Sequence, residues 1–149
     1  MSANLYNSFV KATRDVFKLM LDLSDIEDNP ADDFVCDDSL DISIGVTGDL
    51  EGEVIYRFPP STSLSMVNIM VGMDLDSVDE FVTSAISEIA NIISGNVLTM
   101  LSDNKLKCDI LPPKQGSSDE GKEYDIHQTS CLTTSVGGVC LDIKLNQAN

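Results

Sequence analysis

Glu88 and Asn91 stand three residues apart in the segment SAISEIANIISGN, residues 84–96, where most other positions are apolar or small. The amide of Asn91 has both a hydrogen-bond donor and an acceptor, so it could hold and orient a water molecule, and the Glu88 carboxylate could bind a cation of a partner. Positioning a water in line with a phosphorus atom is much of what catalysis of phosphoryl transfer requires. The pair lacks a nucleophile and neighbouring metal ligands, so a partner would have to supply both.

A long helix is expected to position this pair. Ser77 and Glu80 have the spacing of a capping box, which predicts a helical segment from about 78 to 103. Successive residues of a helix are about 100° apart. One side of the segment then forms a core stripe of Val82, Ala85, Ile86, Ile89, Ile93 and Met100. A different side, pointing out of the core, carries Ser84, Glu88, Asn91 and Gly95.

Gly95 leaves two descriptions of this helix open. Glycine costs about 1 kcal/mol relative to alanine in a helix interior, so its place on the exposed side is locally unfavourable. Either it leaves room for another molecule near Asn91, or it ends one helix before Val97 begins another. The Glu-x-x-Asn spacing also has a plain alternative, because two surface polar residues at this spacing arise by chance.

The elements before this helix follow from periodicity and turn residues. Apolar residues at helical spacing predict a helix over 3–24, followed by a polar surface loop over 24–33. Two alternating stretches joined at Gly48-Asp49 predict a β-hairpin. A short helix should begin at a cap formed by Ser61 and end at Gly72.

The chain after Asn104 is expected to form three strands, in LKCDILPP, EYDIHQTSCLTTS and VCLDIKLN. The polar stretch 114–123 would be a mobile loop, and Gly137-Gly138 would join the last two strands. The full order is α-β-β-α-α-β-β-β. Helices grouped against a mainly antiparallel sheet make this an α+β layered domain.

Charge and composition narrow the classes of partner. The 149 residues carry nine Lys and Arg against 25 Asp and Glu, which gives a net charge of -16. Such a surface repels nucleic acid and anionic membranes, whereas a protein partner with positive surface fits well. No basic head with an apolar run begins the chain, and nowhere do eighteen apolar residues follow one another. We therefore expect neither a signal peptide nor a spanning helix, and a cytoplasmic location.

The cysteines give no metal or disulfide motif. Cys36, Cys108, Cys131 and Cys140 are widely spaced, and His127 is the only histidine that could join them as a ligand. This is not a zinc pattern, so all four are interpreted as small buried apolar residues in a reducing compartment. His127 is interpreted as structural. The Asp-rich stretches DIEDNPADD and VCDDSLD lack the register of a calcium loop and should be solvated turns.

At residues 84–96 the chain resembles the CheC/CheX/FliY family of chemotaxis phosphatases, and its CheX branch most closely. The family motif is Asp or Ser, three residues, Glu, two residues and Asn, with a Pro some twenty residues later. Ser84, Glu88 and Asn91 match it in register, and Pro112 or Pro113 stands at the downstream position. The resemblance extends through the hairpin IGVTGDLEGEVIYRFP and the segment NIMVGM, and covers roughly residues 5–113.

This resemblance implies a single CheX-like layered domain over residues 1–149 that acts in two-component signalling. Members of the family remove phosphate from an aspartate of the response regulator CheY. By resemblance, Asn91 would orient the attacking water and Glu88 would pair with the regulator's lysine. Further partner-binding residues would be Ser84, Gly95, Pro112 and Pro113. The chain would have no metal or cofactor of its own, because the Mg²⁺ would be bound by the partner receiver domain.

The resemblance also bears on assembly and on rival functions. CheC-like relatives carry a second motif on the first helix, but FVKATRDVFKLML has no Glu-x-x-Asn here, so one site per subunit is expected. The CheX branch forms homodimers through sheet edges, and the C-terminal strands are candidates for that interface. The alternative function is a non-catalytic receiver-binding or flagellar-switch-type adaptor of the same fold. A third possibility is a ligand-binding or structural domain in which the motif is incidental. Intact Glu88 and Asn91 favour the phosphatase.

Overall fold

The computed structural model describes residues 2–23, 26–30, 39–72, 74–77, 79–103, 106–116 and 124–147. Its helices are α1 (Ser2–Leu21), α2 (Pro60–Val71) and α3 (Glu80–Asp103). Its strands are β1 (Glu27–Pro30), β2 (Leu40–Gly48), β3 (Leu50–Phe58), β4 (Cys108–Ile110), β5 (Lys114–Gln115), β6 (Ile126–Thr134) and β7 (Gly137–Gln147). The strands form one sheet in the order β1-β6-β7-β3-β2-β4, with β5 beside β2, and every pairing is antiparallel. The predicted α+β class is confirmed.

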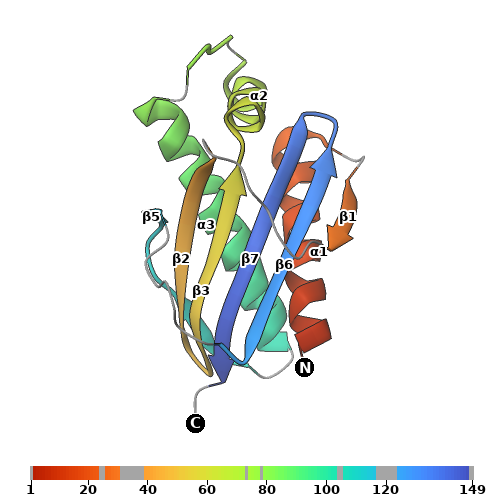
Figure 1. Cartoon of the computed structure of the whole chain (residues 1–149), viewed down its shortest axis with the longest axis vertical. Helices are drawn as coiled ribbons and strands as arrows, with labels where there is room; N and C mark the ends of the chain where they lie inside the picture. Colours follow the sequence, from red (N-terminus) through yellow and green to blue (C-terminus); the bar gives the residue numbers. More distant parts are fainter. Residues whose placement is uncertain are drawn as a thin grey trace.

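The sheet carries its helices on one face. Helices α1 and α3 lie behind the sheet in Figure 1, and α2 lies near the end where β3 stops. The register places Ile42 opposite Tyr56 and Ile44 opposite Val54, so alternate side chains of β2 and β3 point into the same layer. The core between sheet and helices includes Phe9, Phe17, Ile42, Ile44, Tyr56, Phe58, Ile86, Ile89, Ile93, Leu141 and Ile143, all buried.

Several element boundaries differ from the sequence pattern. The turn between β2 and β3 lies at Gly48-Asp49 as predicted, and α1 occupies almost all of the predicted first helix. Part of the predicted loop 24–33 instead forms β1, which pairs with β6. Within the predicted loop 114–123, Lys114–Gln115 form β5, and residues 117–123 lie outside the described ones. The last turn lies at Ser135-Val136, two residues before the predicted Gly137-Gly138.

The start of α2 also differs from its prediction, whereas its end does not. Ser61 is not the cap, because the helix begins at Pro60 after Pro59, and no side-chain hydrogen bond caps it. Proline is favoured in a first helical turn, since its fixed φ suits the helix and it has no N–H to satisfy. At the other end, Gly72 takes the left-handed conformation, with φ of 66°, and its N–H donates to Asn68 O.

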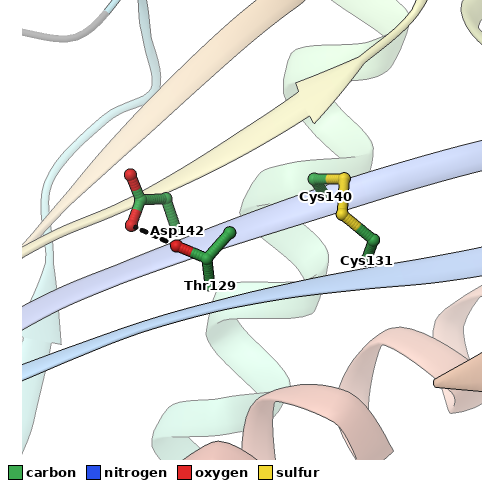
Figure 2. The surroundings of a disulfide bond; sticks show 4 residues. All are labelled: Thr129, Cys131, Cys140 and Asp142. Carbon is green, nitrogen blue, oxygen red and sulfur yellow. Dashed lines mark hydrogen bonds between the residues drawn. A yellow bond between two sulfur atoms is a disulfide. The ribbon is translucent and has the colours of Figure 1, made fainter. Parts of the chain in front are cut away.

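Two of the four cysteines form a disulfide, so the prediction that all four are separate apolar residues is wrong. Cys131 of β6 and Cys140 of β7 face each other in the sheet register, with Cα atoms 4.1 Å apart, and their sulfurs are bonded (Figure 2). Directly opposed antiparallel residues come within disulfide reach whatever their separation in sequence. Cys108 is free and half-buried, and burial raises the pKa of its thiol. Cys36 lies outside the described residues.

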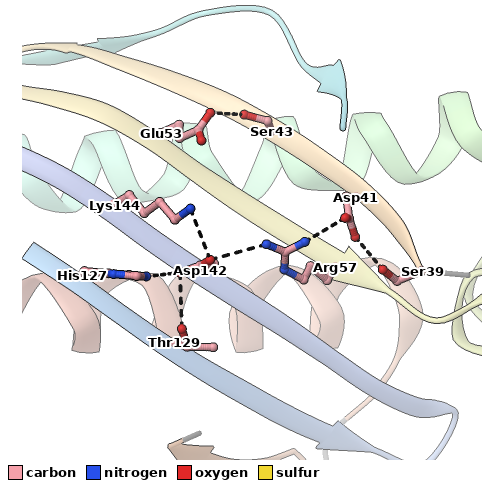
Figure 3. A network of polar contacts seen from close by, with 9 residues as sticks. All are labelled: Ser39, Asp41, Ser43, Glu53, Arg57, His127, Thr129, Asp142 and Lys144. Atoms are coloured by element: carbon pink, nitrogen blue, oxygen red, sulfur yellow. Dashed lines mark hydrogen bonds and ion pairs between the residues drawn. The ribbon is translucent and has the colours of Figure 1, made fainter. Parts of the chain in front are cut away.

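The other face of the sheet carries a network of charged side chains, with no described helix over it (Figure 3). Its centre is Asp142, which accepts from His127 Nε2 at 2.9 Å and from Thr129 Oγ1 at 3.3 Å. Arg57 lies 3.4 Å from the Asp142 carboxylate and donates to Asp41 at 2.7 Å. The predicted structural role of His127 fits this position. An antiparallel sheet can leave one face without helices. Asp142 is buried in this face, and its hydrogen bonds satisfy its carboxylate within the layer.

The strand order also limits where chains could pair edge to edge. The C-terminal strands are the predicted candidates, but β7 lies between β3 and β6 and is paired on both sides over residues 140–145. Strand β1 covers only Ser130–Thr133 of β6, so among the described residues the outer edge of β6 is open over 126–129. The interface prediction is therefore wrong for β7, and it stays possible for β6 alone.

Candidate functional site on helix α3

Helix α3 begins at a different cap from the predicted one. Asp79 Oδ1 accepts a hydrogen bond from Val82 N at 3.1 Å, which satisfies a backbone donor of the first turn. The carboxylates of Asp79 and Glu80 also lie at the positive end of the helix dipole. The predicted capping box of Ser77 and Glu80 is therefore wrong about the cap, although the helix starts within about two residues of the expected place.

The helix is continuous from Glu80 to Asp103, which answers the question that Gly95 left open. A Cβ placed on Gly95 would meet no other atom within 4 Å, so the helix surface is uncovered there. The buried side of α3 consists of Val82, Ile86, Ile89, Ala90, Ile93, Ser94, Val97 and Leu101. Ala85 and Met100, predicted in the core stripe, are only partly buried at its margin.

Length and composition alone would allow α3 to cross a membrane, with a mean hydropathy of 1.3 over its most apolar stretch. We expected no spanning helix from the sequence because no long uninterrupted run of apolar residues occurs. Small polar residues interrupt the apolar residues of α3, so this criterion did not detect it. In the structure the apolar side of α3 packs against the sheet. We therefore interpret it as the core helix of the layer.

The predicted pair lies on the side of α3 away from the sheet. Ser84 and Glu88 are exposed, and Asn91 and Gly95 are half-buried. Glu88 and Asn91 differ by about 60° around the helix and about 4.5 Å along it, so one docked molecule could contact both. We call the side formed by Ser84, Glu88, Asn91 and Gly95 the α3 face. Its chemistry is one carboxylate and one amide presented outward from a rigid rod.

A hydrogen bond on the buried side of α3 connects the helix to the sheet. Tyr56 Oη of β3 and Ser94 Oγ lie 2.9 Å apart, both buried. Burial raises the pKa of the Tyr56 hydroxyl far above its ordinary value, since a phenolate there would lose its hydration, and the bond to Ser94 opposes this only in part. Tyr56 thus stays neutral and holds α3 at one height on β3. Ser94 is adjacent to Gly95, so this contact holds the helix at the level of the α3 face.

The structure does not bring the two prolines to the α3 face. Pro112 lines a pocket of about 150 Å³ together with Ser43, Gly45, Gly52, Glu53, Leu111 and Lys114. Ser43 Oγ donates to Glu53 at 2.8 Å, and both side chains lie on the sheet face that the helices leave free (Figure 3). Pro112 is therefore across the sheet from Glu88 and Asn91. Pro113 is half-buried in the same connection between β4 and β5.

Sequence spacing missed three residues that matter for this helix. Tyr56 and Ser94 are 38 residues apart, and no local pattern indicates that their hydroxyls meet. Phe81 is a large apolar residue left exposed on the first turn of α3. Its distance of seven residues from Glu88 is a signal that the sequence did contain. Among the described residues, no three His, Cys, Asp or Glu side chains are grouped so as to hold a metal ion.

Comparison with known proteins points to one family. The sequence profile of the family described as "Chemotaxis phosphatase CheX" matches residues 42–136. The "CheY-P phosphatase CheX" of Thermotoga maritima is 40% identical over 76 residues, which are 50% of this chain and 49% of that protein. The match thus spans about half the length of this curated relative. The matched profile range contains Glu88, Asn91 and Pro112.

Solved structures share the fold over nearly the whole chain. A CheC-like superfamily protein from Shewanella sp. PV-4 is 24% identical with a TM-score of 0.80, covering 98% of this chain and 99% of that one. A complex of CheX with CheY, BeF₃ and Mg²⁺ from Borrelia burgdorferi gives a TM-score of 0.79 at 22% identity, covering 95% of this chain and 97% of that one. At these identities the likeness shows the layered fold itself.

Proposed function

Because the chain belongs to the CheX family of chemotaxis phosphatases, we propose that it hydrolyses the aspartyl phosphate of a CheY-type receiver domain. The name of its Thermotoga maritima relative, a CheY-P phosphatase, supports this activity. One observation supports the assignment of this activity to particular residues. Glu88 and Asn91 lie on the outward side of a single unbroken helix, where they can enter a partner's active site.

The proposed roles follow from the chemistry of the two side chains. Asn91 would reach the phosphorylated aspartate, accept a hydrogen bond from a water and donate one to a neighbouring oxygen, so that the water is aligned for attack. Glu88 would form an ion pair with the receiver's lysine and fix the depth to which Asn91 enters. Ser84 and Gly95 would contact the receiver on either side of the pair. The assignment of Pro112 and Pro113 to partner binding stays a prediction, and it concerns another side of the molecule.

The metal of this reaction is proposed to belong to the partner. A carboxylate and an amide on the α3 face make too small a donor set for Mg²⁺, which prefers several oxygen ligands in near-octahedral geometry. The Borrelia burgdorferi complex contains CheY, BeF₃ and Mg²⁺ together with CheX. Bound in the receiver, Mg²⁺ would neutralise charge on the phosphoryl oxygens. A cytoplasmic location, where such a receiver would be met, stays a prediction.

The experiment follows phosphate loss from a phosphorylated CheY-type receiver domain with Mg²⁺ present, with and without the protein. We expect the parent to accelerate the loss and Asn91→Ala to lower the turnover about 100-fold to 1000-fold, as loss of one positioning group typically does. Asn96→Ala is the matched control. It removes an exposed amide from the same helix, about 140° away from Asn91 around the axis, and should retain parental turnover.

Two outcomes would contradict the proposal. A folded Asn91→Ala protein that hydrolyses like the parent would remove the role assigned to the amide. A parent protein that binds the receiver without accelerating hydrolysis would instead be the adaptor that the sequence left as the alternative. Measuring the binding of the parent to the same receiver, alongside its turnover, distinguishes the two outcomes.

A further inference from the structure

Phe81 is an exposed aromatic side chain on a helix whose other apolar residues are largely covered. It is 51% exposed, whereas Val82 beside it is fully buried. Leaving about half of a large apolar side chain in water forfeits much of the free energy that its burial would provide. Nothing at this position of the helix requires an aromatic residue for capping, because Asp79 supplies the cap.

Phe81 lies on the α3 face. It precedes Glu88 by seven residues, so the two side chains differ by about 20° around the helix and are about 10.5 Å apart along it. Phe81, Ser84, Glu88 and Asn91 therefore lie within about 80° of one another around the helix. The α3 face is opposite the side that packs on the sheet, and a molecule seated over Glu88 and Asn91 would extend naturally onto Phe81.

The segment that leads into Phe81 is strongly acidic. Asp74, Asp76, Asp79 and Glu80 are all exposed in the approach to the helix and in its first turn. The chain contains no Lys or Arg anywhere from residue 58 to residue 104. An apolar side chain that follows several exposed carboxylates in the chain matches a partner surface whose apolar depression has Lys or Arg beside it.

We propose that Phe81 is the apolar anchor by which the α3 face binds the receiver domain, an inference that rests on the proposed function. Its ring fills a depression on the receiver about two helical turns from the lysine that meets Glu88. The carboxylates that precede Phe81 steer the receiver toward the face, and burial of Phe81 holds it there. A second copy of this chain is a poor occupant, since a two-fold contact would bring two identical acidic segments together. An anionic membrane would be repelled by the same carboxylates.

The test measures binding and turnover separately. The probe is a CheY-type receiver domain loaded with beryllofluoride and Mg²⁺ for the Kd, and the phosphorylated receiver for kcat and KM. Phe81→Ala should weaken binding about 30-fold or more and raise KM, with kcat within about twofold of the parent, because the anchor acts equally before and during the chemical step. Phe81→Leu should restore binding to within about fivefold of the parent.

Leu19→Ala is the matched control. Leu19 is 87% exposed on α1, so the change removes a large exposed apolar side chain elsewhere on the surface and should leave Kd and KM unchanged. A Phe81→Ala protein with Kd within about twofold of the parent, or with lower kcat at unchanged KM, would overturn the anchor. If the parent binds but does not hydrolyse, the proposed function fails and the Kd comparison still decides the role of Phe81. A parent that does not bind the receiver would overturn both.

Discussion

The buried hydroxyl pair of Tyr56 and Ser94 makes a prediction about high pH. The native state holds the Tyr56 proton to a higher pH than the unfolded chain, whose tyrosines titrate near pH 10. Above about pH 10 the unfolded state loses this proton while the native state keeps it. The contribution of Tyr56 to stability is therefore complete below pH 10, and it falls above that by about 1.4 kcal/mol per pH unit.

Tyr56→Phe removes this titration and isolates the effect. At pH 8 the variant should be about 1 kcal/mol less stable than the parent, because Ser94 loses its buried partner. Between pH 10 and 11 the difference should shrink or reverse, since only the parent loses the Tyr56 contribution. Denaturant unfolding at pH 8, 10 and 11 measures both. Cys108, whose raised pKa acts in the same direction, is present in both proteins and cancels. Parallel pH curves for the two proteins would contradict the prediction.

At the scale of single residues, local spacing predicts the side of an element on which a side chain lies, but not the residues that it contacts. It correctly places Glu88 and Asn91 on the outward side of a helix, because that depends only on the helical repeat. The meeting of Tyr56 with Ser94, and of Cys131 with Cys140, depends on how separate elements are aligned in space. A shift of two residues in the last turn was enough to hide that Cys131 and Cys140 are directly opposed.

Gly95 and Gly72 differ in whether their backbone conformation requires glycine. Gly95 and Gly72 both have open space where a Cβ would lie, but only Gly72 has a positive φ, of 66°. Gly95→Ala should raise the free energy of unfolding by about 1 kcal/mol, because alanine is the better residue in a helix interior. Gly72→Ala should lower it by about 1 kcal/mol, because a Cβ is unfavourable in the left-handed conformation.

The same pair of variants probes the proposed docking. If Gly95 provides room for the receiver, the stabilised Gly95→Ala protein should have a higher KM for the phosphorylated receiver, and Gly72→Ala should not. Thermal unfolding and steady-state kinetics measure the two effects independently. A Gly95→Ala protein that is more stable and equally active would leave Gly95 without a part in binding. Stability changes of equal sign in both variants would contradict the assignment of the two backbone conformations.

The elements that sequence reasoning found are those with long periodic patterns. The helices and the longer strands extend over nine or more residues of clear alternation or helical repeat. Strand β1 has the sequence EDNP, in which acidic residues and proline disfavour a strand, and it forms because β6 offers it an edge to pair with. Strand β5 has two residues and no pattern of its own. The predictions of the helix caps were wrong for a related reason, because several adjacent polar residues could each have capped α2 or α3.

At the scale of the whole molecule, sequence alone gave the layer arrangement but not the order of strands. Alternation shows that each strand has one buried side, and grouping of helices predicts a second layer. Neither pattern predicts which strands are adjacent in the sheet. The sequence therefore allowed β7 to be an edge strand, although it lies inside the sheet. The charged network around Asp142 was hidden in the same way, because its members come from four strands, β2, β3, β6 and β7.

The strand order makes a final prediction about assembly, namely that the homodimer expected from the resemblance forms through the open part of the β6 edge. The Cα distance of 4.1 Å between Cys131 and Cys140 marks a non-hydrogen-bonded pair of the ladder. Thr129 precedes Cys131 by two residues in β6, so its backbone has the same orientation as that of Cys131. Its N–H and C=O therefore point away from β7, toward the open edge. No described residue pairs with Thr129 there.

Thr129→Pro should therefore break the dimer without removing a ladder bond to β7, since proline lacks only the outward N–H. The parent should elute with light-scattering mass twice that of one chain, and the proline variant with the mass of one. Thr129→Val is the control for the lost hydroxyl, which donates to Asp142 at 3.3 Å, and it should remain dimeric. Because α3 is on the helical layer and β6 pairs through its edge, the monomeric variant should keep receiver hydrolysis per chain. A proline variant that stays dimeric, or a monomeric parent at tens of micromolar, would place the interface elsewhere or remove it.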